Sequence, residues 1–257
     1  MNRLVFITGA SGGIGQALAL RYAEAGWRLA LSARRAGELT TWAQAQGWPA
    51  DRWRVYRADV ADTTSIVAAG QQCLAEQGVP DVVIANAGIS IGIDTAVRGD
   101  IDRMARIFAT NNVGMAATFH PFIDPMRQRG RGTMVGIASV AGIRGLPGHG
   151  AYCASKAAVI NYCESLRGEL RASGVKVVTI APGYIDTPMT RRNRHPMPFL
   201  MSAESFAERA FHAIEAGASY RVIPWPMALA AKLLRMLPNT LLDHLLAGQP
   251  RKQRLEE

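Results

Sequence analysis

The sequence predicts one α/β domain whose core is a doubly wound, Rossmann-like parallel sheet of about seven strands. Two observations support this fold. Short apolar segments alternate with longer stretches of helical periodicity along most of the chain. The first of these segments, residues 3–8, leads through a glycine-rich turn directly into a helical pattern at 16–25. The chain of 257 residues is long enough to bury a sizeable core in a single domain.

Six further apolar segments are predicted strands, and predicted helices separate most of them. The strands are expected at 28–32, 53–58, 81–85, 133–138, 175–181 and 220–224, and the helices at 62–77, 99–128 and 151–172. This order is typical of βαβ units, in which the strands run parallel and their carboxyl ends meet at one edge of the sheet. Open α/β sheets bind their ligands at that edge.

The net charge of +9, from 29 basic and 20 acidic residues, indicates an anionic partner. A nucleic acid, an anionic membrane surface and a phosphate-bearing small ligand all match such a charge. The basic residues are spread along the chain and no nucleic-acid-binding module is recognisable, so we expect no nucleic-acid partner. A small ligand rich in phosphate matches the charge better.

The cysteines and histidines predict neither disulfides nor a metal site. Cys73, Cys153 and Cys163 are odd in number and have no Cys-x-x-Cys spacing, which indicates a reduced, cytoplasmic setting. The first apolar segment is too short for the core of a signal peptide, so we expect no export signal. The five histidines are scattered, and no metal-ligand cluster is expected.

The glycine-rich turn at 9–15 predicts a binding site for a dinucleotide. Gly9, Gly13 and Gly15 let main-chain amides approach a pyrophosphate, and the helix that follows favours negative charge at its N-terminus. The Gly-x-x-x-Gly-x-Gly spacing differs from the commoner Gly-x-Gly-x-x-Gly, but a predicted strand and a predicted helix flank it on the two sides.

The end of the second strand predicts which dinucleotide binds. A dinucleotide fold usually has an acid there for the 2′-hydroxyl of the adenosine ribose, whereas this chain has Ala33-Arg34-Arg35. Because guanidinium groups suit a phosphate and no carboxylate would repel it, we expect NADP rather than NAD, with Arg34 at the 2′-phosphate. The alternative is that both arginines are solvated charges that open the next helix.

Two short motifs follow the third and fourth strands. Asp59-Val60 lies where a carboxylate reaches an adenine amino group, and Asn86-Ala87-Gly88 offers small residues beside a cofactor. Ordinary turn chemistry explains either motif equally well.

Tyr152 and Lys156 provide acid-base chemistry at the same edge of the sheet. Their spacing of one helical turn puts both side chains on one face of the helix predicted at 151–172. An ammonium beside a phenol favours the phenolate, so the pair can move a proton to or from a carbonyl oxygen. Ser139 follows the fifth predicted strand and is expected at the same edge. A Tyr-x-x-x-Lys spacing also arises by chance, so its context decides.

These motifs together resemble the short-chain dehydrogenases/reductases, over roughly residues 3–224. The resemblance rests on Thr8-Gly-Ala-Ser-Gly-Gly-Ile-Gly15, Asp59, Asn86-Ala-Gly88, Asn111 within Asn-Asn-Val-Gly114, Ser139, Tyr152-x-x-x-Lys156 and Pro182-Gly183, all in the family's order. With the arginine argument it implies a carbonyl reductase of the NADP-preferring type. It also implies a homo-oligomer.

The resemblance implies a role for each matching residue. Tyr152 would be the general acid or base, Lys156 would lower its pKa and bind the nicotinamide ribose, Ser139 would polarise the carbonyl, and Asn111 would hold a water that links Lys156 to solvent. Thr187 would contact the nicotinamide amide, although a helix N-cap is an alternative role for it. The remaining cofactor contacts would come from Gly9, Ser11, Gly13, Ile14, Gly15, Arg34, Asp59, Val60, Asn86, Ala87, Gly88, Pro182, Gly183 and Ile185.

Two segments outside these motifs bear on the substrate. Residues 184–201 contain Met189, Met197, Phe199, Leu200 and Met201, either as a lid over an apolar substrate or as core packing beneath a loop. Nearby Arg191, Arg192 and Arg194 suit an acidic substrate or lipid, or simply an exposed loop.

The C-terminal part predicts two short amphipathic helices separated by Pro238, with charges that exclude a membrane span. They would pack within the protein, cover the substrate pocket, form a subunit interface or lie on a membrane surface. We expect residues 1–224 to form the dinucleotide-binding and catalytic domain and residues 225–257 to be a helical extension of the same domain.

The sequence therefore predicts an NADP(H)-dependent oxidoreductase that interconverts an apolar or lipid-like ketone or aldehyde with its alcohol. A second enzyme class, isomerisation or dehydration of nucleotide sugars by related but longer chains, matches the length less well. A non-catalytic NADP sensor on the same fold is the alternative from another class. The complete set of Ser139, Tyr152 and Lys156 argues against a sensor.

Overall fold

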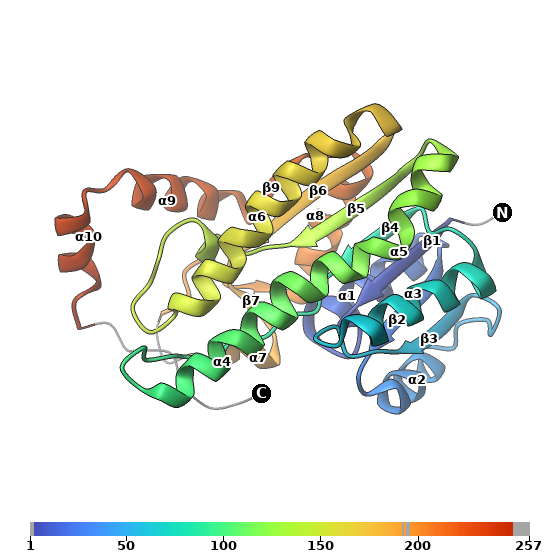
Figure 1. Ribbon diagram of the computed structural model, residues 1–257, viewed down its shortest axis with the longest axis horizontal. Coiled ribbons are helices and arrows are strands. Elements are labelled where there is room, and N and C mark those ends of the chain that lie inside the picture. Colours follow the sequence, from blue (N-terminus) through green and yellow to red (C-terminus); the bar gives the residue numbers. More distant parts are fainter. Residues whose placement is uncertain (1–2, 192, 194–195, 249–257) are drawn as a thin grey trace.

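A parallel sheet forms the centre of the molecule, and its strand order confirms the predicted fold class. The computed structural model describes residues 3–191, 193 and 196–248. Seven strands pair in the order β3-β2-β1-β4-β5-β6-β9 (Figure 1). They are β1 Leu4–Thr8, β2 Arg28–Ala33, β3 Trp53–Arg57, β4 Val82–Ala85, β5 Gly132–Ile137, β6 Val175–Pro182 and β9 Tyr220–Ile223. Every predicted strand is present, with its ends shifted by at most one residue.

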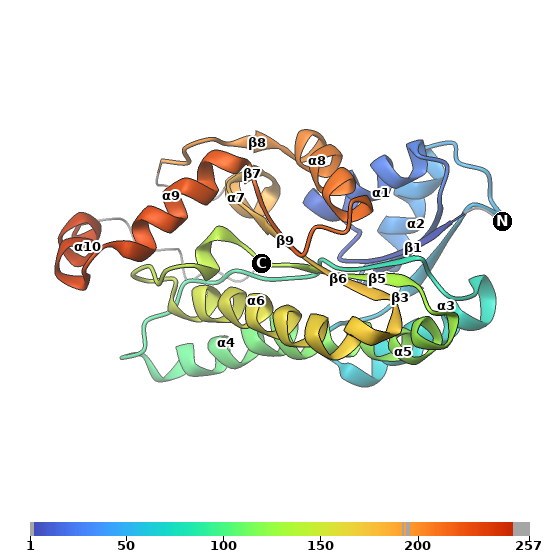
Figure 2. The ribbon, with the colours of Figure 1, turned by 90° about the horizontal axis from the view of Figure 1, so that it is seen from above.

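Helices cover the two faces of the sheet (Figure 2). One face carries α1 Gly13–Glu24, α2 Ala36–Ala45 and α8 Ala203–Glu215, and the other carries α3 Thr63–Gln77, α4 Arg98–Phe108, α5 Gly114–Arg129 and α6 Gly150–Leu170. Alternate strand residues serve the two layers: Leu4 and Phe6 of β1 join one buried cluster, and Val5 and Ile7 join the other. Because both faces are covered at the centre of the sheet, every residue of β1 and β4 is buried.

The chain reverses its direction of winding at β1. This strand pairs in parallel with β2 on one side and with β4 on the other. The loops that follow β1 and β4 therefore leave the sheet toward opposite faces and open a crevice at the carboxyl edge. The glycine-rich turn follows β1, and Asn86 follows β4, so both motifs lie at this crevice.

The helical stretch predicted at 99–128 is present as α4 and α5, with a π-helical segment between them. α4 and α5 are separated by a π-helical segment, Ala109–Val113, that contains the buried Asn111. The Asn111 side chain binds residues of two other segments, and the extra residue in the turn aims it there. The apolar pattern of the sequence continues through this segment and gives no sign of the bulge.

The C-terminal helices extend away from the sheet at the end opposite the N-terminus (Figures 1 and 2). They are α9 Trp225–Met236 and α10 Asn239–Leu246, as the amphipathic pattern predicts. Before them lie a short helix, α7 Pro188–Arg191, and a two-stranded pair, β7 Ile185–Asp186 with β8 Met201–Ser202. Within the described residues, no helix combines the length and apolarity needed to cross a bilayer.

Candidate active site

A cavity of about 510 Å³ lies along the carboxyl edge of the sheet. Of the sequence-predicted site residues it is lined by Gly9, Ser11, Gly13, Ile14, Arg34, Asp59, Val60, Asn86, Ala87, Gly88, Ser139, Tyr152, Lys156, Pro182, Gly183, Ile185 and Thr187. Their order along the edge follows the strand order, because each group follows a different strand. Arg34 and Asp59 lie toward β2 and β3, and Ser139 and Pro182 lie toward β5 and β6.

The glycine-rich turn is shaped by close packing. Gly9 has φ +66° and Gly13 has φ +51°, values that glycine adopts without strain. A Cβ at Gly15 would lie 2.2 Å from the main-chain oxygen of Gly9, whereas nothing lies within 4 Å of a Cβ at Gly12. Gly15 therefore lets the turn close on itself behind the cavity wall, and the backbone at Gly12 faces open space that suits a ligand.

Asn86, which follows the neighbouring strand β4, forms hydrogen bonds to this turn. Its Nδ2 donates hydrogen bonds to the main-chain oxygens of Thr8 at 3.0 Å and Gly9 at 3.3 Å. In return, the Thr8 hydroxyl accepts the main-chain N–H of Asn86 at 3.1 Å and that of Ala87 at 3.2 Å. The two loops on either side of the crevice are thus fixed to each other.

Lys156 is buried at the centre of the cavity wall, with 5 % of its surface exposed. Its Nζ donates a 2.9 Å hydrogen bond to the main-chain oxygen of Ile137 and lies 5.8 Å from the centre of the Tyr152 ring. Burial disfavours the ammonium and lowers the pKa of Lys156 to about 8. The predicted pair on α6 therefore shares one face and points into one cavity.

Asn111 lies behind this wall and does not line the cavity. Its Oδ1 accepts the main-chain N–H of Ile89 at 2.9 Å, and its Nδ2 donates to the Ile89 oxygen at 3.0 Å and to Ser155 Oγ at 2.9 Å. The Ser155 hydroxyl in turn donates to the Tyr152 oxygen at 2.8 Å. The amide of Asn111 thus joins the segment after Gly88 to the first turns of α6.

Ser139 follows β5 and is mostly buried. Its Oγ accepts the main-chain N–H of Ala141 at 3.2 Å, which caps a short 3₁₀ turn, Val140–Gly142. A Cβ at Gly142 would lie 2.6 Å from the main-chain carbon of Lys156. The absence of a side chain at Gly142 therefore lets the Ser139 turn pack directly on α6.

Arg34 and Arg35 are exposed and line the cavity at the end of β2. Arg35 is paired with Glu38 at 2.8 Å, as expected for a charge that opens α2, whereas Arg34 has no such partner among the described residues. Beside them the Ser32 hydroxyl is buried in the cavity wall without a hydrogen-bond partner in the described structure. This end of the cavity is thus basic and holds an unsatisfied polar atom.

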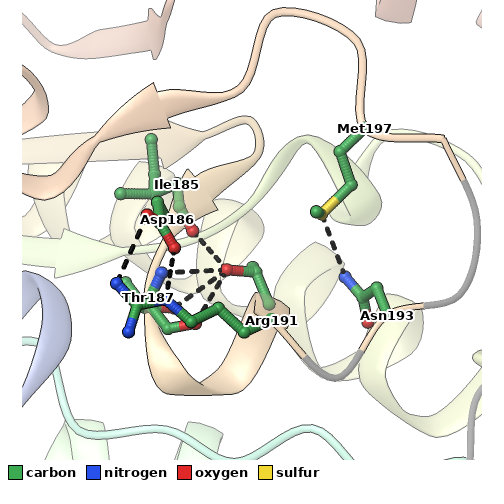
Figure 3. Close-up of polar contacts among 7 residues, drawn as sticks. Ile185, Asp186, Thr187, Arg191, Asn193 and Met197 are labelled. Carbon is green, nitrogen blue, oxygen red and sulfur yellow. Dashed lines mark hydrogen bonds and ion pairs between the residues drawn. The ribbon is translucent and has the colours of Figure 1, made fainter.

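Thr187 and Thr190 form a compact polar turn at α7, and Figure 3 shows Thr187 beside Asp186 and Arg191. Thr190 Oγ1 accepts the Thr187 N–H at 3.0 Å, lies 3.2 Å from Thr187 Oγ1, and contacts the oxygens of Ile185 and Thr187. The main-chain oxygen of Thr187 accepts the N–H groups of Thr190 and Arg191, each at 3.0 Å, and its hydroxyl faces that of Thr190. Asp186 and Arg191 form an exposed ion pair at 2.7 Å beside it.

Comparison with known proteins identifies the family of this chain. A family model described as short chain dehydrogenase matches residues 3–198. The chain belongs to this family. It is 38% identical over 244 residues to an uncharacterized oxidoreductase of Myxococcus xanthus, covering 94% of this chain and 95% of that one. It is 34% identical over 195 residues to the 2-(R)-hydroxypropyl-CoM dehydrogenase of Xanthobacter autotrophicus, covering 74% and 78% of the two chains. The solved structure of ElxO with NADP bound superposes with a TM-score of 0.79 at 22% identity, covering 87% of this chain and 97% of that one.

This short-chain dehydrogenase has cavity residues that the sequence motifs do not include. Ile89, Ile91, Arg106, Thr110 and Thr190 also line the cavity. Arg106 in α4 and Thr110 in the π-helical segment are one helical turn apart, so they lie on the same side of the helix. Many other residue pairs in the sequence have the same spacing, so the sequence alone does not single out this pair. Thr190 is recognisable only once the α7 turn is folded.

The apolar residues of 184–201, expected either as a lid or as core packing, lie in different environments in this short-chain dehydrogenase. Met189 lines the cavity, whereas Phe199 and Leu200 are 55% and 48% exposed. Asn193 Nδ2 donates a 3.7 Å hydrogen bond to Met197 Sδ (Figure 3). Arg191 pairs with Asp186, and Arg192 and Arg194 lie outside the described residues. One member of the apolar set is therefore placed to touch a substrate.

Cys73, Cys153 and Cys163 are buried and free. Burial raises the pKa of Cys163 to about 11 and that of Cys73 to about 12, so neither is a reactive thiolate near neutral pH. Across residues 3–191, 193 and 196–248, no cluster of three or more His, Cys, Asp or Glu side chains is arranged to hold a metal ion.

Proposed function

We propose that this short-chain dehydrogenase is an NADP(H)-dependent oxidoreductase that interconverts a ketone or aldehyde with its alcohol. The observation that carries the proposal is that Tyr152, Lys156 and Ser139 line the same cavity as the glycine-rich turn and Arg34. Acid-base groups toward β5 and a phosphate-binding turn at β1 are therefore arranged along one crevice, as a reaction between a substrate and a dinucleotide requires.

The cavity fits NADP in three respects. The backbone at Gly12 is open to the cavity at the N-terminus of α1, which suits a pyrophosphate. Arg34 and Ser32 at the end of β2 offer a guanidinium and an unpartnered hydroxyl to a 2′-phosphate. No carboxylate stands at residues 33–35 to repel that phosphate. Asp59 and Val60 would lie at the adenine, and Asn86, Ala87, Gly88, Pro182, Gly183, Ile185 and Thr187 farther along the cofactor.

Each residue near α6 has a chemical role in the proposal. A bound NADPH would supply the hydride. Tyr152 donates its phenolic proton to the carbonyl oxygen of the substrate, and in the reverse direction it accepts the proton from the alcohol. Lys156 favours the ionised phenol by its charge, and Ser139 donates a hydrogen bond that polarises the carbonyl. Asn111 keeps the first turns of α6 in place, because its amide holds Ser155.

We propose an apolar or amphipathic substrate. Ile89, Ile91 and Met189 lie on the cavity wall, and Met189 is flexible enough to adapt to different apolar shapes. The relative from Xanthobacter autotrophicus is a dehydrogenase by its name, which supports an alcohol or carbonyl substrate rather than a sensing role. We also propose a homo-oligomer, as the family resemblance implies.

The experiment that tests the proposed function is a titration with NADPH and NADH followed by turnover measurements. NADPH oxidation is followed against a panel of aliphatic, ketoacyl and steroid ketones. The proposal predicts tighter binding of NADPH than of NADH and turnover with at least one apolar ketone. NADPH binding without turnover on any member would favour the sensor, and a preference for NADH would contradict the role of Arg34.

The C-terminal helices present an exposed apolar row, for which we propose an anionic membrane surface as the partner. On α9, Trp225, Leu229, Leu233 and Met236 are 71, 55, 51 and 73% exposed, and their spacing places them on one side of the helix. Packing within the protein therefore does not cover this face in the described chain, although Met227 and Ala231 on the other side of α9 are buried.

The charge of α9 supports an anionic lipid surface as the partner. The two charged residues of α9 are Lys232 and Arg235, both basic and both exposed. An apolar row with basic flanks suits anionic lipid, whereas a second copy of the same face would bring like charges together. Two hydrogen bonds fix the orientation of this face. Arg144 Nη2 donates to the Leu237 main-chain oxygen at 3.2 Å and to Asn239 Oδ1 at 2.8 Å. The face is thereby tied to the loop that separates Ser139 from Tyr152.

A further inference from the structure

Thr190 is a cavity-lining residue that none of the sequence motifs includes. It lies in α7, one turn after Thr187, and its hydroxyl contacts groups of Ile185 and Thr187. Four groups surround Thr190 Oγ1: the N–H and Oγ1 of Thr187, and the main-chain oxygens of Ile185 and Thr187. A hydroxyl has one proton and accepts two hydrogen bonds, so the partners decide where each proton lies.

The Thr190 hydroxyl donates its hydrogen bond to the main-chain oxygen of Ile185. The Thr187 oxygen already accepts two main-chain N–H groups, from Thr190 at 3.0 Å and from Arg191 at 3.0 Å. Ile185 is 2% exposed, and its oxygen has Thr190 Oγ1 as a donor within reach. Because a buried carbonyl without a donor is costly, the hydroxyl of Thr190 is used as a donor to Ile185.

The remaining capacity of Thr190 Oγ1 is as an acceptor of two hydrogen bonds. One comes from the Thr187 N–H at 3.0 Å. The other partner is Thr187 Oγ1 at 3.2 Å, and since Thr190 has no second proton, Thr187 is the donor of that bond. The hydroxyl proton of Thr187 therefore points at Thr190, and the lone pairs of Thr187 Oγ1 are left for a ligand.

We propose that Thr190 is a positioning residue that makes Thr187 a hydrogen-bond acceptor toward the cavity, and so selects a cofactor whose ring carries an N–H donor. The inference rests on the proposed function, in which Thr187 lies beside the nicotinamide amide. The amide NH₂ is the donor that an acceptor at Thr187 would recognise. A threonine free to rotate would bind the amide oxygen equally well, and would not distinguish an amide from a ketone.

The test compares NADP⁺ with its 3-acetylpyridine analogue, in which a methyl group replaces the amide NH₂ and the carbonyl is kept. Dissociation constants are measured by calorimetry for the wild type, Thr187→Val, Thr190→Val and Thr190→Ser. The wild type is expected to bind NADP⁺ about fivefold to tenfold more tightly than the analogue, the worth of one hydrogen bond. Thr187→Val and Thr190→Val should reduce this ratio to within twofold of unity, and Thr190→Ser should keep it.

A control is Thr64→Val, which removes the hydroxyl of an exposed threonine on α3 that does not line the cavity. Its ratio of the two affinities should equal that of the wild type. A wild type that binds both cofactors equally, or a Thr190→Val protein that keeps the wild-type ratio, would overturn the inference. If the wild type binds the analogue but no preference is lost in Thr187→Val, Thr187 is not the acceptor. Absence of any NADP⁺ binding would instead contradict the proposed function, and the inference with it.

Discussion

Lys156 of α6 donates a 2.9 Å hydrogen bond to the main-chain oxygen of Ile137, the last residue of β5. This bond joins the helix that carries Tyr152 to the strand that ends just before Ser139. The ammonium is thereby held in the cavity wall, 5.8 Å from the centre of the Tyr152 ring. The positions of the acid-base residues are therefore fixed by the packing of α6 on the end of β5.

Burial of Lys156 should make the stability of the cofactor-free protein depend on pH. The unfolded chain keeps this lysine protonated up to about pH 10.5, whereas its pKa in the folded chain is about 8. Between these values the unfolded state binds more protons, so the contribution of Lys156 to the free energy of unfolding rises with pH. The rise is about 1.4 kcal/mol per pH unit, and about 3 kcal/mol over the whole window.

The measurement is urea unfolding of the wild type and of Lys156→Met at several pH values from 7.5 to 9.5. Buried Cys73, Cys163 and Tyr56 have raised pKa values and oppose the trend, because their ionisation favours unfolding. The difference between the two proteins removes most of these contributions, since both proteins contain the three residues. A difference that is constant across this range would show that Lys156 is not buried as a perturbed ammonium.

Arg34 should determine the choice between the two cofactors. Arg34→Gln removes a charged donor from the 2′-phosphate, which should weaken NADPH binding by about tenfold to a hundredfold and leave NADH binding unchanged. Dissociation constants from fluorescence titration provide the test. Arg35→Gln is the matched control, because Arg35 lies beside it but is paired with Glu38. Equal losses for both cofactors in Arg34→Gln would indicate a general effect of charge.

Gly142 should be intolerant of any side chain. A Cβ there would lie 2.6 Å from main-chain atoms of Lys156, so Gly142→Ala must displace the Ser139 turn or α6. We expect a loss of about 1–3 kcal/mol in the free energy of unfolding together with a large loss of turnover. Gly145→Ala in the same loop is the control, since nothing lies within 4 Å of its Cβ. Denaturation and NADPH oxidation of both variants check this, and a fully active Gly142→Ala enzyme would contradict it.

The exposed row on α9 should bind anionic lipid. The full chain is expected to float with vesicles that contain phosphatidylglycerol, less with pure phosphatidylcholine vesicles, and less again in high salt. Replacing Leu229 and Leu233 together by serine should weaken partition by about tenfold or more, because two leucine side chains lose their apolar contact. Ile101→Ser, at a 40% exposed position on α4, is the matched control.

Two results would contradict the membrane surface as partner. One is equal partition of the wild type and the Leu229 and Leu233 double variant into the anionic vesicles. The other is a wild-type oligomer that becomes a monomer in the double variant, measured by light scattering, which would identify the row as a contact between copies of this chain.

The strands and most helices are predictable from the sequence because their signals are local. The strands of a covered parallel sheet read as continuous apolar runs, and Gly9 to Gly15 marks the first turn. Helix α8 is missing from the predicted elements, although Ser202 caps it, with Oγ accepting the Ser205 N–H at 3.1 Å, and Phe206 and Ala210 begin its apolar face. The sequence signal for this helix is therefore its cap at Ser202.

The parts of the site that were not predictable depend on contacts between distant segments. Asn111 was expected to hold a water that links Lys156 to solvent, whereas the hydrogen bonds of its amide to Ile89 and Ser155 were not predicted, because they form only when three segments meet. Gly142 is an ordinary loop glycine in the sequence, and only the packing of α6 shows why it has no side chain. Thr190 likewise gains its environment from the folding of α7.

The central claim is that Tyr152 is the acid and base of a carbonyl oxidoreductase, and it is tested most directly by single-turnover NADPH oxidation with the best ketone of the panel. Tyr152→Phe keeps the ring and removes the proton donor. The account predicts that NADPH binds the variant as tightly as the wild type, while the rate of hydride transfer falls by about a hundredfold to ten thousandfold. A Tyr152→Phe enzyme that oxidises NADPH at the wild-type rate would contradict it.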